Sequence, residues 1–424
     1  MTLLTPPQKC SEHHSKLMNS DNFIVQQASS KDEKSIERFF EEALPHRSEY
    51  KFPHRWNWLF KDNPFWDSQK GVPCWIAKKG NRVVGMAGIM PCVFEFFQQP
   101  HLGGWCIDFR VLEEFRGTGL GKMLQASRQN ELSTFSLGMS KISRIVKSKT
   151  GQTSGPLHTV YLKVKRFDSS LLLKDILRYL KIEDINNSKW YYFGVRSGAA
   201  GLLSIIATLL FNRNSCAKRQ AHNTETPDLL TFDKIDNFGP NINVLWDQIK
   251  TRYSCAVRRY DEYLNWKYIN QPHMNYQCYT VSNNGILCGV IVFRKGESPE
   301  PDVGIIAEAY TLLGREAQYL IVEFAVEKLF SMGAKMVQCY STDELMGGIL
   351  QDLGFLPIRY EVPMFSIIGE AAGLSEKISK TRWFMSLGDA DRDQYPAITH
   401  PSVKILIDLI KGKIEGEELI YRES

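Results

Sequence analysis

The chain has 424 residues, a formal net charge of +5 and a hydrophobic share of 43%. This length allows two or three domains with full cores, and a charge this mild does not indicate a nucleic-acid partner. The nine cysteines are odd in number and form no C-x-x-C pair. That pattern is typical of reduced thiols, so we predict a cytoplasmic protein without a metal site.

The first part of the chain alternates strands and helices. Residues 1–21 are polar and lack the apolar core of a signal peptide, so they are expected to form a disordered tail. Ser30 and Glu33 read as a capping box that opens a helix, and Pro45 ends it. Further strands are expected at 22–28, 74–78, 82–89, 134–138 and 158–167, with 93–97 extending the one at 82–89, and helices are expected near 122–132 and 142–149.

The most informative stretch is 104–124, which predicts a strand, a glycine-rich turn and the start of a helix. The pattern from 105 to 111 has the period of a pleated strand, because Trp105, Ile107, Phe109 and Val111 alternate with Cys106, Asp108 and Arg110. Three glycines follow at 117, 119 and 121. They bring bare backbone to a helix N-terminus, where unpaired N–H groups favour an anion. A phosphate-bearing ligand is therefore expected at this turn.

The glycine spacing excludes two common nucleotide-binding motifs. A Walker loop requires Ser or Thr after Gly-Lys, whereas Met123 follows Gly121-Lys122. The Rossmann fingerprint requires G-x-G-x-x-G near the first strand, whereas this chain has G-x-G-x-G after about a hundred residues.

The stretch from Arg116 to Gly121 reads R-x-x-G-x-G. It resembles the acetyl-CoA motif of the GNAT superfamily of N-acetyltransferases, and the resemblance covers residues 22–168. It implies a mixed α/β fold and an acyl-CoA co-substrate, acetyl or longer. The residues that it places at the cofactor are Phe109, Arg110, Val111, Arg116, Gly117, Thr118, Gly119, Leu120, Gly121 and Lys122.

Residues 169–225 are expected to form a helical connector. Within it, residues 197–211 are apolar but shorter than the roughly 20 residues that span a bilayer. This stretch is compatible with a buried connecting helix, or with an interfacial helix that contacts a membrane without spanning it.

The second half of the chain repeats the plan of the first. Residues 55–64 recur as 263–272, with Asn, Trp and Pro coinciding at a constant offset of 208. We therefore predict a second, degenerate GNAT-like domain over 226–368 and a C-terminal extension over 369–424. The degeneracy is indicated at 312–317, where Leu-Leu-Gly-Arg-Glu-Ala replaces the glycine turn. The expected elements are strands at 304–313, 335–340 and 358–368 and helices at 314–332 and 343–353.

The acidic run 389–393 briefly resembles a calcium loop. Its sixth position is Gln394 rather than Gly, and its twelfth is His400 rather than Glu. We therefore interpret it as a polar loop.

The GNAT resemblance implies direct acyl transfer from the thioester to an amine, with a base for the amine and an acid for the thiolate. The strand position that often holds a glutamate base is Trp105, and the position that often holds a tyrosine acid is Lys147. Asp108 is the nearest carboxylate to that strand position. The catalytic candidates are Asp108, Tyr161 and Glu308, with His158 as a further possibility.

The leading hypothesis is a CoA-dependent N-acyltransferase acting on a small amine, an amino sugar, or a peptide or protein amine. A second hypothesis is aminoacyl transfer from tRNA, as in peptidoglycan-bridge enzymes of this fold, but the intact glycine turn disfavours it. A third is a non-catalytic acyl-CoA-binding or scaffold protein, which the missing base and acid would suit.

Overall fold

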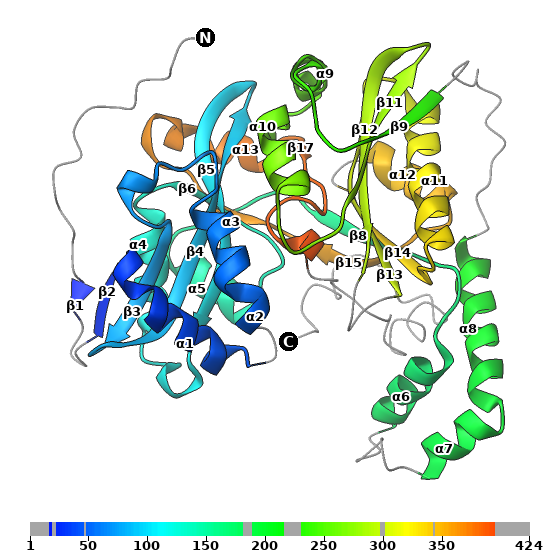
Figure 1. The fold of residues 1–424 in the computed structure, drawn as a ribbon, viewed down its shortest axis with the longest axis horizontal. Helices are drawn as coiled ribbons and strands as arrows, with labels where there is room; N and C mark the ends of the chain where they lie inside the picture. Colours follow the sequence, from blue (N-terminus) through cyan, green and yellow to red (C-terminus); the bar gives the residue numbers. More distant parts are fainter. Residues whose placement is uncertain are drawn as a thin grey trace.

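The computed structural model describes residues 17–18, 23–45, 48–180, 189–215, 230–296, 302–341 and 344–394. Within them the chain forms two mixed β-sheets flanked by helices (Figure 1). Most of the predicted N-terminal tail, and the C-terminal extension after residue 394, lie outside the described residues.

Sheet A is ten-stranded, and its main path runs β1-β2-β3-β4-β5-β6-β16-β7, with β10 pairing β4 and β17 pairing β10. Its strands are β1 (Leu17–Met18), β2 (Phe23–Gln27), β3 (Cys74–Lys79), β4 (Arg82–Phe96), β5 (Gln99–Val111), β6 (Ser133–Ser136), β7 (Thr153–Ser154), β10 (Cys255–Val257), β16 (Met364–Ser366) and β17 (Trp383–Phe384).

Sheet B is seven-stranded, in the order β15-β8-β14-β13-β12-β11-β9. Its strands are β8 (His158–Val164), β9 (Leu230–Ile235), β11 (Gln277–Asn283), β12 (Ile286–Lys295), β13 (Val303–Thr311), β14 (Met336–Ser341) and β15 (Leu356–Glu361). We call the half of the molecule built on sheet A unit 1 and the half built on sheet B unit 2.

The two units exchange one strand each. Strand β8 comes from the first half of the sequence but lies between β14 and β15, while β16 comes from the second half but lies between β6 and β7. The strand expected at 158–167, within the region of resemblance 22–168, is thus paired in sheet B. The single strand expected over 358–368 was wrong, because two strands in different sheets form there. Val362 and Pro363 separate β15 from β16, and a proline cannot donate to a ladder, so the chain changes sheets there.

The helices are α1 (Glu33–Ala43), α2 (Ser48–Tyr50), α3 (Trp56–Phe60), α4 (Leu120–Gln129), α5 (Lys141–Lys149), α6 (Ser169–Tyr179), α7 (Lys189–Arg196), α8 (Ala199–Ser215), α9 (Asn241–Ile249), α10 (Asp261–Leu264), α11 (Arg315–Ser331), α12 (Glu344–Asp352) and α13 (Ser375–Ser379). The helices expected before Pro45 and near 122–132, 142–149, 314–332 and 343–353 are present, and α2, α3, α9, α10 and α13 were not predicted. The capping box before α1 uses Ser29 and Asp32 rather than Ser30 and Glu33, because the first turn is a 3-10 turn that starts one residue earlier.

The predicted repeat has a physical counterpart where the units meet. Trp58 and Trp266, which are 208 positions apart, stack with ring centroids 4.7 Å apart and 16° between their planes. The indole N–H of Trp58 donates to the carbonyl of Trp266 at 2.9 Å, and that of Trp266 donates to the carbonyl of Trp58 at 3.1 Å. Such reciprocal contacts are expected where equivalent residues face each other across a local two-fold axis.

The acidic run 389–393 ties the units together through ion pairs. Asp391 pairs with Arg55 of unit 1 at 2.9 Å. Asp389 pairs with Arg259 at 2.8 Å, and Asp393 pairs with Lys267 at 3.1 Å. The repeated aspartates therefore serve as buried or half-buried anchors for basic side chains from both halves.

Candidate acyl-CoA site

The glycine turn lies at the N-terminus of α4, as the sequence predicts. Gly117 and Gly119 adopt positive φ angles of 84° and 85°, the left-handed region that favours glycine. A Cβ at either position would meet nothing within 4 Å, so the outer face of the turn is open. Within the described chain the backbone N–H groups of 117–119 donate no hydrogen bond. Those of Leu120 and Gly121 begin α4 before any intrahelical bond can form, and the first bonds of the helix run from Lys122 and Met123 to the carbonyl of Gly119. The turn therefore presents a row of donors suited to phosphate.

Strand β5 leads into this turn with a free edge. It pairs with β6 only from Gly103 to Trp105, and no described strand pairs with β5 on that side beyond Trp105. The edge at 106–111 could therefore accept an extended amide chain as an added strand. Gly121 lies close to it, since a Cβ there would be 3.4 Å from the Phe109 ring. The structure thus brings the ten predicted cofactor residues together.

A bulge at Asp108 shapes this edge. Its φ is +49°, and the β4–β5 register shifts between Met86 and Gly88. The Asp108 carboxylate accepts from Arg55 Nη1 at 2.7 Å and from Lys51 Nζ. Burial alone would raise the pKa of Asp108, but Arg55 and Lys51 outweigh it and hold that pKa well below its usual range. Asp108 is therefore suited to fixing the bulge and poorly suited to accepting a proton.

A cleft of about 240 Å³ opens beside the bulge. Lys51, Asp108 and Arg110 supply its polar lining, and α1 supplies an apolar wall. This cleft gives an acceptor room next to the free edge of β5.

Two buried cations lie where β5 and β6 part. Arg128 of α4 donates to the carbonyl of Gly88 at 3.0 Å, and Lys147 of α5 donates to Gln125 Oε1 at 3.1 Å. Neither pairs with a carboxylate among the described residues, which is unusual because burying a charge without a counter-ion is costly. Burial lowers the pKa of Lys147 to about 8.

The Cys106 thiol faces these cations. Burial alone would raise its pKa, but Arg128 and Lys147 outweigh burial and bring the pKa below its usual value. The Ser136 hydroxyl also faces the thiol and lowers its pKa, and the buried amide nitrogen of Gln125 has no hydrogen-bond partner among the described residues. The cluster is therefore arranged to stabilise a thiolate at the point where the strands separate.

Comparison with known proteins agrees with this arrangement. Residues 35–128 match the model of the acetyltransferase (GNAT) family. This part of the chain is a GNAT domain. No curated protein is a significant match to the sequence.

Similar solved structures were also found. A GCN5-related N-acetyltransferase from Anabaena variabilis is 13% identical, with a TM-score of 0.53, covering 83% of this chain and 74% of its own. One from Kribbella flavida is 11% identical, with a TM-score of 0.49 and coverages of 84% and 73%. The N-myristoyltransferase of Saccharomyces cerevisiae with bound myristoyl-CoA is 9% identical, with a TM-score of 0.47 and coverages of 82% and 84%. At 13% identity the Anabaena protein shows the fold alone.

The second GNAT-like unit has the same parting of strands but a filled groove. β13 pairs with β14 only from Val303 to Ile305. Beyond that point the backbone N–H of Gly388 donates to the carbonyl of Ala307 at 3.0 Å, so the chain's own 383–388 segment occupies the edge. The space that remains between the strands is about 50 Å³. That is room for a few water molecules.

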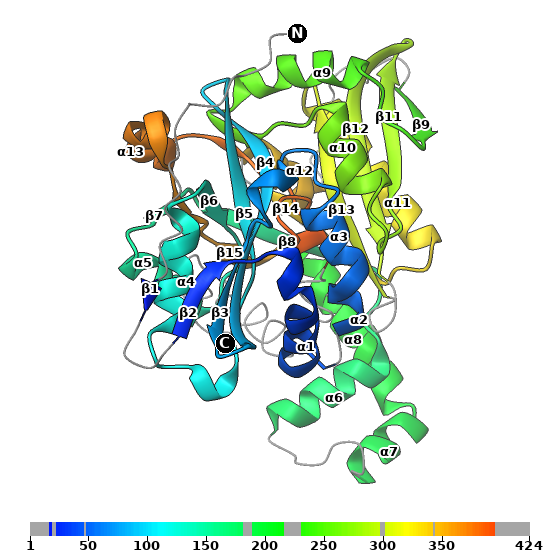
Figure 2. The same cartoon turned by 60° about the vertical axis from the view of Figure 1, so that its left-hand side comes forward.

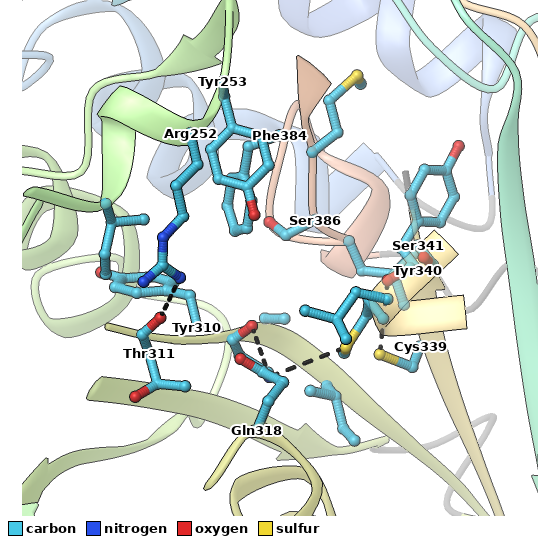
Figure 3. Close-up of a pocket in the computed structure, with 18 of the residues that line it drawn as sticks. Arg252, Tyr253, Tyr310, Thr311, Gln318, Cys339, Tyr340, Ser341, Phe384 and Ser386 are labelled. Carbon is cyan, nitrogen blue, oxygen red and sulfur yellow. Dashed lines mark hydrogen bonds between the residues drawn. The ribbon is translucent and has the colours of Figure 1, made fainter. Parts of the chain in front are cut away.

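Figure 3 shows this remaining cavity. Arg252 donates to the carbonyl of Thr311, and Phe384 and Ser386 reach in from the C-terminal segment. The corresponding helix, α11, begins after Gly314 with a φ of −75° and lacks the paired left-handed glycines. Unit 2 therefore keeps the framework of a GNAT site without its opening.

The other predicted catalytic residues lie in unit 2, away from the glycine turn. Tyr161 is on β8, paired between β14 and β15, and burial raises its pKa. Glu308 on β13 is fully buried, accepts from Tyr268 Oη at 2.8 Å and pairs with Arg259 at 3.2 Å. Burial raises the pKa of Glu308 above its usual range. His158 is also on β8, and burial lowers its pKa to about 3.

The structure brings together residues that the sequence did not single out. Cys106 was noted only as part of the strand alternation, and Lys147 only as a departure from the tyrosine of the family. Gln125 and Arg128 stand three apart on one face of α4, so the sequence shows that these two polar residues share a helix face. What they face could not be read without the fold.

Proposed function

We propose that this protein is a CoA-dependent N-acyltransferase and that unit 1 holds the acyl-CoA. The observation that carries the proposal is the open glycine turn next to the unpaired edge of β5. The backbone N–H groups of 117–121 bind the pyrophosphate, and the edge at 106–111 pairs with the pantetheine amides. The match of residues 35–128 to the GNAT family supports this proposal.

The proposed reaction is direct transfer. The acceptor amine attacks the thioester carbonyl, a C–N bond forms, the C–S bond breaks and the acyl group leaves CoA as an amide. The amine nitrogen gives up its proton to water, and the CoA thiolate takes a proton from the Lys147 ammonium. Arg128 holds the thiolate charge before that transfer. The cleft beside Asp108 admits the acceptor, for which Asp108 is a positioning residue.

Unit 2 supports the site in this proposal without binding CoA, because its groove is filled by residues 383–388. The cleft by α1, with a volume of about 240 Å³, suits a small amine or an amine on an extended peptide. Tyr161 and Glu308 are assigned structural roles in unit 2 under this proposal.

Isothermal titration calorimetry with acetyl-CoA and palmitoyl-CoA tests the binding step. Wild-type protein should bind, and Gly119→Ala should weaken binding about tenfold, because a side chain at positive φ costs roughly 1–2 kcal/mol and displaces the turn. Gly314→Ala is the matched control at the start of α11, where φ is negative and the space is open. It should leave binding unchanged. Absence of binding by wild type would reject the proposal.

Release of free CoA thiol over an amine panel then tests the chemistry. Turnover with any amine supports an acyltransferase. Tight binding without turnover would favour the scaffold alternative. A gel shift with bulk tRNA together with no CoA binding would favour aminoacyl transfer.

A further inference from the structure

Helices α6 to α8 extend beyond the two units at one end of the molecule in both views (Figure 1 and Figure 2). Among the described residues, nineteen large apolar side chains are exposed, and ten of them lie between Trp190 and Leu210. Trp190, Phe193 and Leu209 are 68%, 66% and 64% exposed. A patch of this size marks an interaction surface, because soluble monomers rarely leave so many apolar residues together in water.

The exposed residues of α8 form one continuous face. Leu202, Leu203, Ile205, Ile206, Leu209 and Leu210 are exposed, and at 100° per residue they cover about 160° of the helix. Between Leu202 and Leu210 no polar residue lies on that arc, because Ser204 and Thr208 project from the other side of the helix. The sequence left open whether this stretch is buried or interfacial, and the structure shows that this face is not buried.

The opposite face of α8 is fixed to the body. Ser204 Oγ donates to the carbonyl of Phe167 at 2.5 Å, and the backbone N–H of Phe167 donates to Thr208 Oγ1 at 3.2 Å. The ring of Phe211 packs edge-on against that of Phe167 at 5.7 Å. Because this side is held by polar and aromatic contacts, the apolar side is held outward.

Helix α7 adds aromatic and basic residues. Trp190, Tyr192 and Phe193 are exposed beside Lys189 and Arg196, which are exposed as well. Residues 189–215 contain three basic residues and no Asp or Glu. Aromatic rings and basic side chains at the ends of an apolar surface are typical of helices that lie in the interface of an anionic bilayer.

The geometry of the pair also fits an interface better than a span. No single described helix is long and apolar enough to cross a membrane, but α7 and α8 together pass by length and composition with a bend of 76° between them. At 1.5 Å per residue α8 is about 25 Å long, less than the roughly 30 Å of a hydrocarbon core.

We propose that α7 and α8 form a bent pair of docking helices that inserts its apolar face into the surface of an anionic lipid bilayer. Lys189 and Arg196 contact the headgroups, and Trp190, Tyr192 and Phe193 lie at the level of the headgroup boundary. The inference does not depend on the proposed acyltransferase activity. The occupant is lipid rather than a second copy because an all-basic, aromatic rim would repel its own copy but attract anionic headgroups.

Vesicle sedimentation with the full chain tests the proposal. Wild-type protein should bind phosphatidylcholine–phosphatidylglycerol vesicles, and bind pure phosphatidylcholine vesicles more weakly. The variant Leu202→Gln/Ile205→Gln/Leu209→Gln should bind at least about tenfold more weakly, because three apolar side chains no longer enter the bilayer. Val244→Gln/Ile286→Gln is the matched control, since both residues are exposed and apolar but lie on α9 and β12. It should bind like wild type.

A second measurement keeps the apolar face intact. Brominated lipids should quench tryptophan fluorescence of wild-type protein, and Trp190→Phe should lose most of that quenching. Lys189→Glu/Arg196→Glu should lose the preference for anionic vesicles. Failure of wild type to bind either vesicle, or equal loss in the Val244/Ile286 control, would overturn the proposal. So would a wild-type dimer in light scattering that the triple variant converts to a monomer, since the occupant would then be a second copy.

Discussion

Units 1 and 2 share a strand order, a reciprocal strand exchange and a place where two parallel strands part, yet only unit 1 is open there. In unit 1, β5 leaves its partner after Trp105 and no described strand replaces it. In unit 2, Gly388 donates to the carbonyl of Ala307 and closes the same edge. A duplicated fold can therefore lose a ligand site by filling it with its own chain, without losing its framework.

The bulge carboxylates show the same divergence. Asp108 faces Lys51 and Arg55, while Glu308 faces Arg259 and Tyr268. Lys51 and Arg259 are 208 positions apart, so the basic partner is part of the repeat. The pKa of Asp108 is held low by its two cations, whereas burial raises that of Glu308. Losing the negative charge of the bulge carboxylate is therefore expected to cost more stability in unit 1 than in unit 2.

The largest expected effect follows from that difference. Asp108→Asn should lower the free energy of unfolding by about 3 kcal/mol or more, because it removes the charge that faces both Lys51 and Arg55, even though Arg55 keeps Asp391. Glu308→Gln should cost about 1–2 kcal/mol, because Arg259 keeps Asp389. Urea denaturation of both variants measures the difference. Equal losses, or a larger loss for Glu308→Gln, would contradict this account of the two bulges.

The next effect concerns the buried cations, which the proposed reaction uses in unit 1. Lys147→Met should lower kcat about 100-fold if its ammonium protonates the CoA thiolate, with acyl-CoA affinity little changed. Burial lowers the pKa of Lys147 to about 8, so the ammonium fraction and kcat should both fall as pH rises through 8. Steady-state kinetics over pH measures this.

The control for that experiment is Lys149→Met, which changes an exposed lysine on the same helix. Its kcat should fall as pH rises through 8, as in the wild type. Stability provides a second check, because the folded state binds fewer protons than the unfolded state between pH 8 and the ordinary lysine value of 10.5. Wild-type stability should therefore rise with pH across that window relative to Lys147→Met. If kcat of Lys147→Met still fell through pH 8 as in the wild type, the proton for the CoA thiolate would come from another group.

The smallest effect tests the pseudo-symmetry itself. Trp58→Phe and Trp266→Phe each remove one of two reciprocal hydrogen bonds at the unit boundary, so each should cost about 1 kcal/mol. The double variant should deviate from additivity, because the rings are stacked. A loss confined to one of the two single variants, again in urea, would show that the contact is not symmetric in energy.

The sequence by itself determined the features that depend on neighbouring residues. The alternation over 105–111 predicted β5, the glycines at 117 and 119 predicted an open turn at a helix start, and the 208-residue offset predicted the repeat. Each follows from local backbone geometry or from matching short segments. The ten predicted cofactor residues lie within 109–122, so the same local geometry keeps them together in the structure.

The tertiary structure decided what depends on contacts between distant segments. Whether 158–164 pairs with β6 or β14 is a competition between sheets, which alternation within one strand cannot reveal. Tyr161 and Glu308 therefore lie in unit 2, while Cys106 and Lys147 meet across two elements of unit 1. Likewise, the hydropathy of 197–211 suits a buried or an exposed helix, and only the packing of Ser204 and Thr208 against Phe167 sets which face meets the surroundings.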